Sequence, residues 1–76
     1  MTGSGPHTVD ISTFNDVAEV GDVYRSGRVV EMSVRDAEPE VARRAVDFAT
    51  GLVYGDRGSM SRIDQSTYRL VPNSQS

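Results

Sequence analysis

The chain has 76 residues, no cysteine and a single histidine, His7, so disulfide frameworks and cysteine-based zinc sites are excluded. Eleven acidic residues outnumber eight basic ones, all of them arginine, and the net charge of −3 argues against nonspecific binding to nucleic acid. No apolar run approaches the roughly 20 residues that would cross a bilayer.

A chain of this size forms one small domain, which buries only about 60% of the surface of its unfolded state. Self-association is one way for such a domain to become adequately stable. Residues 1–6 and 73–76 are small, polar and aperiodic, and we expect both ends to be flexible. The folded domain is therefore expected to span residues 7–72.

The first half of this domain reads as a strand, a helix and a second strand. The strands are expected at His7–Ile11 and Arg28–Val34. Ser12 or Thr13 is the expected helix cap, and Gly27 sits where a left-handed residue commonly ends a helix. The apolar positions of this helix are Phe14, Val17, Ala18, Gly21 and Tyr24.

The second half begins with a longer helix. Asp36 is the expected cap, Pro39 is tolerated in the first turn, and Gly55 and Gly58 are expected to end the helix.

A hairpin closes the chain, with strands at Ser59–Ile63 and Thr67–Val71 around a polar turn. The order β-α-β-α-β-β predicts an α+β fold, a two-layer α/β sandwich with two helices packed on a small mixed sheet.

The second helix carries two adjacent apolar stripes. The first is Val41, Ala45, Phe48 and Leu52, and the second is Ala42, Val46, Ala49 and Val53. Together they cover an arc of roughly 160°, wider than the ~100° that a helix needs to pack on one sheet. The helix is either wedged between the sheet and the first helix, or one stripe faces a second subunit. We favour the second interpretation, a two-fold dimer, because so short a chain offers little else to cover the arc.

Candidate catalytic groups are nearly absent. His7 lies beside a flexible end, and the carboxylates of Asp36, Glu38 and Glu40 are better explained as charges that favour the start of a helix. The segment Gly55–Gly58 lacks the spacing of a phosphate-binding loop. We expect neither enzyme activity nor a cofactor or metal.

The hairpin presents residue types that are enriched in binding hot spots. Met60 and Arg62 share one side of their strand, as do Tyr68 and Leu70 on the next. Arg62 and Tyr68 either contact a partner or pack on each other as an ordinary cross-strand pair.

Several segments, in the same order, resemble the core domain of the SepF family of bacterial cell-division proteins. Ala42–Tyr54 is similar to the family's Ala-Arg-Arg-Ile-Val-Asp-Phe-x-x-Gly-x-x-Tyr helix at nearly every position. Phe14-Asn15-Asp16-Val17 and Gly27-Arg28-Val29-Val30 resemble the starts of its first helix and following strand. Gly58, Arg62, Ile63, Tyr68 and Pro72 fit its closing hairpin.

The resemblance implies a dimeric adaptor that binds the C-terminal tail of FtsZ, the tubulin-like division protein, and helps to assemble the septum. It assigns the tail to a surface around Arg62 and Tyr68, to which we add Met60. It also places Gly51 on a subunit-packing surface. The expected dimer interface is Val41, Ala45, Phe48, Gly51 and Leu52.

The chain also departs from the family pattern. Residues 1–6 cannot form the amphipathic membrane-binding helix with which members usually begin, so we expect no direct membrane binding by this chain. Gly55-Asp56 replaces an Ala-Leu pair, and Glu31 puts a charge in the second strand. Both changes are expected near the FtsZ groove and the sheet, where they would weaken binding.

Two functions follow, both for a cytoplasmic protein that acts at the division site. One is the FtsZ-binding adaptor. The alternative is an unanchored regulator that pairs with or caps a full-length SepF paralogue without binding FtsZ itself.

Overall fold

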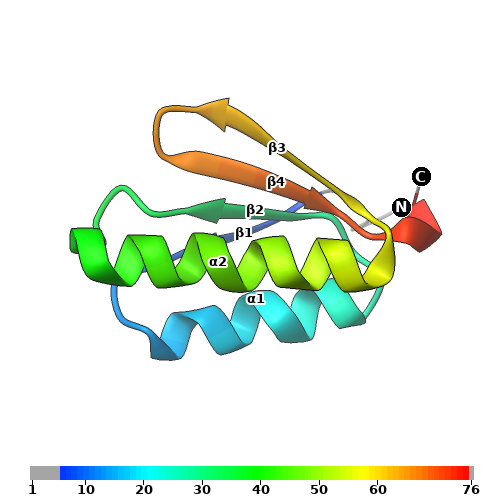
Figure 1. Cartoon of the computed structure of the whole chain (residues 1–76), viewed down its shortest axis with the longest axis horizontal. Coiled ribbons are helices and arrows are strands. Elements are labelled where there is room, and N and C mark those ends of the chain that lie inside the picture. The colour runs from blue at the N-terminus through cyan, green and yellow to red at the C-terminus, as the bar shows by residue number, and fades with distance from the viewer. Residues whose placement is uncertain (1–5, 76) are drawn as a thin grey trace.

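Four strands and two helices follow one another in the expected order in the computed structural model, which describes residues 6–75. The elements are β1 (His7–Asp10), α1 (Asn15–Arg25), β2 (Val30–Ser33), α2 (Pro39–Asp56), β3 (Ser59–Asp64), β4 (Thr67–Val71) and a 3₁₀ turn at Asn73–Gln75. The strands form one sheet in the order β1-β2-β4-β3, and both helices cover the same face of it (Figure 1). The predicted two-layer sandwich is confirmed.

The sheet is mixed, as expected. β1 pairs with β2 in parallel, and β4 is antiparallel to both β2 and β3. The central strands β2 and β4 therefore come from opposite halves of the chain, while β1 and β3 form the two edges.

A single apolar core lies between the sheet and the helices. Its fully or nearly fully buried members are Val9, Ile11, Val17, Val20, Tyr24, Val30, Met32, Ala45, Ala49, Val53 and Leu70. The edge strand β3 contributes none of them. The core is thus built from the two helices and the other three strands, together with Ile11 just after β1.

The start of α1 differs from the prediction. The N-cap position is held by Phe14, and neither Ser12 nor Thr13 caps the helix. Instead the Asp16 carboxylate accepts the backbone N–H groups of Ser12 and Thr13, at 2.9 and 3.0 Å, and the Ser12 hydroxyl at 3.1 Å. These bonds hold the pKa of Asp16 below its usual value, and the bond from the Ser12 N–H has the largest effect.

The buried side of α1 also differs in part. Val17, Gly21 and Tyr24 are buried as expected, together with Val20. Phe14 and Ala18 are exposed. Phe14 leaves the inner stripe because it precedes the first helical residue.

The start of α2 follows its proline rather than Asp36. Pro39 is the first helical residue, as expected, and Glu38 is the N-cap with no side-chain bond. Proline disfavours helical geometry in the residue before it, and Glu38 is extended with ψ 155°. Asp36 consequently lies in the preceding turn and cannot cap the helix.

α2 ends between Gly55 and Gly58, the two glycines that were expected to end it. The helix continues to Asp56, and Arg57 adopts the left-handed conformation with φ 59°. Gly27, by contrast, takes the expected left-handed position after α1 with φ 92°. Gly58 is required for space, because a Cβ there would collide with the Tyr24 hydroxyl and the Val71 carbonyl.

The two chain ends have different outcomes. Residues 1–5 lie outside the described residues, so flexibility there stays a prediction. Asn73 is not free: its N–H donates to the Asp56 carboxylate at 2.8 Å, and it begins the 3₁₀ turn.

We predict that Gly58→Ala lowers the free energy of unfolding by about 1–3 kcal/mol, because the added methyl group overpacks a backbone contact. Urea denaturation measures the change. Gly55→Ala is the matched control: its Cβ would meet nothing within 4 Å, and a helical Gly→Ala change should stabilise by about 0.5–1 kcal/mol. Equal midpoints for Gly58→Ala and wild type would contradict the prediction.

Candidate functional site

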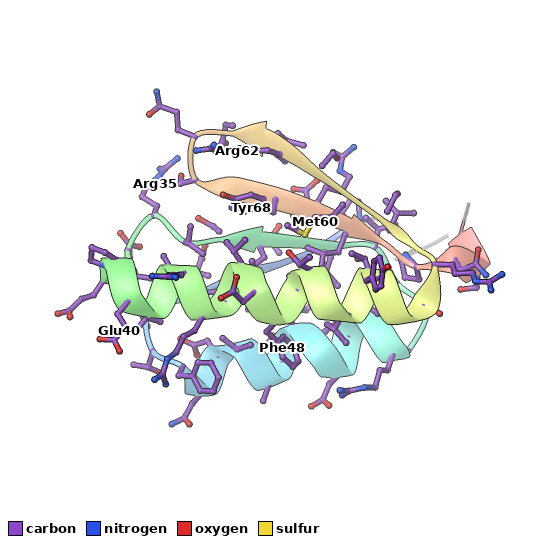
Figure 2. The ribbon with its side chains drawn as sticks, viewed as in Figure 1. Arg35, Glu40, Phe48, Met60, Arg62 and Tyr68 are labelled. Carbon is purple, nitrogen blue, oxygen red and sulfur yellow. The ribbon has the colours of Figure 1, made fainter. Side chains whose placement is uncertain are left out.

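Met60, Arg62 and Tyr68 share the helix-facing side of the hairpin, and we call these three residues the hairpin patch (Figure 2). Arg62 lies opposite Tyr68, and Met60 lies opposite Leu70. Tyr68 is also opposite Met32 on β2, which is completely buried. The common side predicted for these residues is confirmed.

The patch stays accessible because β3 is an edge strand. Met60 and Tyr68 are half-buried and pack against the core, whereas Arg62 is exposed. An apolar surface with one guanidinium is thus presented beside α2. This combination suits a short peptide that carries an apolar and an acidic side chain.

The Arg62 guanidinium is held in place by its own hairpin. Its carbon lies 5.7 Å from the centre of the Tyr68 ring, within cation–π range. Its Nε donates to the Asp64 carbonyl at 3.2 Å and one Nη donates to the Gln65 carbonyl at 2.7 Å. The cross-strand packing alternative therefore describes the isolated chain correctly. A guanidinium has five N–H donors, so donors remain for a partner.

The residues proposed for a dimer interface divide into two groups. Ala45 is completely buried in the core, so it cannot contact another subunit, and its assignment to the interface is wrong. Val41, Phe48 and Leu52 are half-buried, and Gly51 is exposed with nothing within 4 Å of a Cβ placed on it. The buried residues of α2 are Ala45, Ala49 and Val53, all within its apolar arc, and Phe48 lies against Gly21 of α1.

An apolar hollow lies on the helix layer, at the seam between α1 and α2. It is lined by Phe14, Asn15, Val17, Ala18 and Phe48. The Arg44 guanidinium carbon lies 5.8 Å from the centre of the Phe14 ring, which is 49% exposed. Sequence reasoning missed Phe14 and Ala18 as surface residues because helical spacing assigned both to the core.

Neither departure from the family pattern places a side chain in the hairpin patch. The Asp56 carboxylate, at the far end of α2 from the β3–β4 turn, accepts the Tyr24 hydroxyl at 2.9 Å and the Asn73 N–H. Glu31 is paired in register with Arg69, on the sheet face away from the helices, and accepts its guanidinium at 2.8 Å. Both carboxylates make bonds that support the fold, and the weakening of FtsZ binding expected from these departures stays a prediction.

Two further observations concern chemistry and membranes. Within residues 6–75 no three His, Cys, Asp or Glu side chains are grouped so as to hold a metal ion. His7 lies 3.1 Å from the Glu19 carboxylate, between β1 and α1. Neither of the helices described in this range is long and apolar enough to span a bilayer.

The same architecture occurs in two solved structures of archaeal proteins. A SepF-like protein from Pyrococcus furiosus matches with a TM-score of 0.80 at 20% identity, over 95% of this chain and 90% of the other. A SepF-like protein from Archaeoglobus fulgidus matches with a TM-score of 0.81 at 13% identity, over 88% of this chain and 83% of the other. The chain thus has the fold of SepF-like proteins.

Sequence comparison assigns the family. The family model for cell division protein SepF matches residues 7–75. The SepF of Micrococcus luteus is 45% identical over 65 residues, which is 86% of this chain and 31% of the relative. That of Kocuria rhizophila is 38% identical over 66 residues, 87% of this chain and 38% of the relative. The chain belongs to the SepF family, and it spans about a third of the length of these curated relatives.

The Tyr24–Asp56 bond predicts a loss of stability at alkaline pH. Burial, and then the bond to Asp56, raise the pKa of Tyr24 to about 12 from a usual value of 10. The folded state therefore keeps a proton that the unfolded state loses, so this contribution is complete below pH 10 and is lost as the pH rises through about 12.

Urea midpoints at pH 7, 10 and 11 test this, with wild type compared with Tyr24→Phe. The variant should have a lower midpoint at pH 7 and a smaller alkaline decline. Tyr54→Phe is the control, because the Tyr54 ring is 86% exposed. Equal alkaline declines in all three proteins would contradict the assignment.

Proposed function

We propose that this chain is a non-catalytic cell-division adaptor that binds the C-terminal tail of FtsZ through the hairpin patch. The observation that carries this proposal is the position of the Arg62 guanidinium over the Tyr68 ring. Arg62 and half-buried Met60 both lie on the edge strand β3. SepF membership supplies the division context. The protein acts in the cytoplasm at the division site.

The physical case rests on preorganisation. Two carbonyls of the turn fix the guanidinium before a partner arrives, so binding loses less side-chain entropy than it would with a free arginine. The same bonds leave the Tyr68 ring and the Met60 thioether accessible to an apolar side chain of the peptide. An extended peptide with neighbouring apolar and acidic residues matches both features.

We further propose that the working unit is a dimer formed by the helix layer. Gly51 permits close approach on the outer side of α2, and the seam hollow offers exposed Phe14 next to half-buried Phe48. Val41 and Leu52, both half-buried on α2, complete the proposed interface. Ala45 supports it from within the core.

The second candidate is a regulator that pairs with or caps a full-length SepF relative and does not bind FtsZ. Tyr54, 86% exposed on α2, favours this candidate because so large an exposed aromatic ring is typical of a protein-binding surface. The two candidates differ in whether the hairpin patch is used.

Titration of the FtsZ C-terminal peptide against wild type, Arg62→Gln and Arg69→Gln distinguishes them. We expect saturable binding that Arg62→Gln weakens by about tenfold or more, because a charge-assisted bond is lost. Arg69 is the matched control, a neighbouring arginine on the opposite sheet face. Absence of binding by wild type at high micromolar peptide would exclude the adaptor and leave the regulator.

Sedimentation equilibrium at several protein concentrations tests the dimer. Gly51→Gln should weaken self-association by about tenfold or more without reducing the stability of the monomer, because its Cβ enters open space. Thr50→Gln, one residue along and rotated by about 100°, should leave the dimer unchanged. A strictly monomeric wild type would refute this part of the proposal.

A further inference from the structure

A second hollow lies at the end of the sheet, where the loop from β2 to α2 meets the β3–β4 turn. It is lined by Val34, Arg35, Asp64, Gln65 and Ser66, which we call the turn notch. The Val34 N–H donates to the Ser66 carbonyl at 2.8 Å, and the Ser66 N–H donates to the Asp64 carboxylate at 2.8 Å. The first bond joins the two sides of the notch, and the second holds the Asp64 side chain within the turn.

Arg35 contributes a guanidinium to this notch. Among the described residues, this guanidinium forms no ion pair within 4 Å. Its side chain is exposed and extends towards the β3–β4 turn (Figure 2). Arg25, Arg44 and Arg69, by contrast, each have a carboxylate within that distance. The charge of Arg35 is therefore available to a partner.

Asp64, the nearby carboxylate, is already committed to the turn. The Ser66 N–H is the main cause that holds the pKa of Asp64 below its usual value, and bonds from Thr67 and the charge of Arg35 act in the same direction. The carboxylate thus stays ionised and bound to backbone, without closing into a contact ion pair with Arg35. A second carboxylate can approach the guanidinium from the open side.

The turn notch is continuous with the hairpin patch. Arg62 donates to the carbonyls of Asp64 and Gln65, two of the residues that line the notch. One surface therefore runs from Met60 and Tyr68, past the Arg62 guanidinium, to Arg35. It carries two guanidinium groups on a chain whose net charge is −3.

We infer that Arg35 is a specificity-determining residue for the peptide bound at the hairpin patch, and that the turn notch receives an acidic side chain of that peptide. The inference rests on the proposed adaptor function and adds a second anchoring point. An apolar side chain then lies on Tyr68 while a carboxylate further along the peptide accepts from Arg35. Two separated anchors fix the direction and register of the bound segment, which one anchor cannot do.

The test is a double-mutant cycle between protein and peptide. The protein forms are wild type, Arg35→Gln and the control Arg57→Gln, which removes the same charge at the far end of α2. The peptides are the FtsZ C-terminal peptide and a version whose acidic side chains are replaced by their amides. Thermal unfolding of each variant verifies that the exposed substitutions leave the fold intact.

We expect Arg35→Gln to weaken binding of the acidic peptide by about five- to tenfold and to leave binding of the amide peptide unchanged. Arg57→Gln should change neither by more than about twofold. The coupling should shrink as salt is raised, since the site is exposed.

Three results would overturn the inference. The first is that Arg35→Gln binds the acidic peptide as tightly as wild type does, and the second is that it loses the same factor for both peptides. The third is that inorganic phosphate at equal concentration displaces the peptide, which would indicate a general anion site. If Arg62→Gln weakens binding while Arg35→Gln does not, the adaptor function stands and this inference fails. If wild type binds neither peptide, both fail together.

Discussion

The junction between α2 and β3 sets the geometry on which the rest of the molecule depends. The Tyr24 hydroxyl and the Asn73 N–H converge on the Asp56 carboxylate, so α1, α2 and the segment after β4 are joined at one point. Two residues later, Gly58 passes so close to Tyr24 and Val71 that no side chain fits. From this junction the chain continues into β3, the edge strand next to β4.

This placement explains why the candidate site is open. A strand beneath both helices would have buried Met60 completely, as Met32 is buried on the central strand β2. At the edge, Met60 is half-buried and Arg62 remains at the surface, and Tyr68, at the turn end of the adjacent strand β4, is half-buried as well. The binding surface is thus a consequence of strand order and needs no separate pocket.

The sequence was sufficient for the element order, the side shared by the hairpin residues and the left-handed Gly27, because each depends on local signals. It was not sufficient for features that depend on direction in space. The α2 arc could be measured from helical spacing, but its centre could not, and so Ala45 was assigned to a partner instead of the core. The start of α1 was predicted wrongly because the Asp16 carboxylate accepts hydrogen bonds from the N–H groups of two residues that precede it, Ser12 and Thr13. Arg35 was not predicted as a site residue because its neighbours belong to the β3–β4 turn, which is distant in sequence.

The strand order has a further consequence, for cooperativity. β4 is the last strand of the described chain yet lies in the middle of the sheet, between β2 and β3. Unfolding of the hairpin therefore removes a central strand and with it the support of the core. A ligand that holds the hairpin stabilises the whole domain by mass action, so occupancy of one exposed edge is transmitted to the global folding equilibrium.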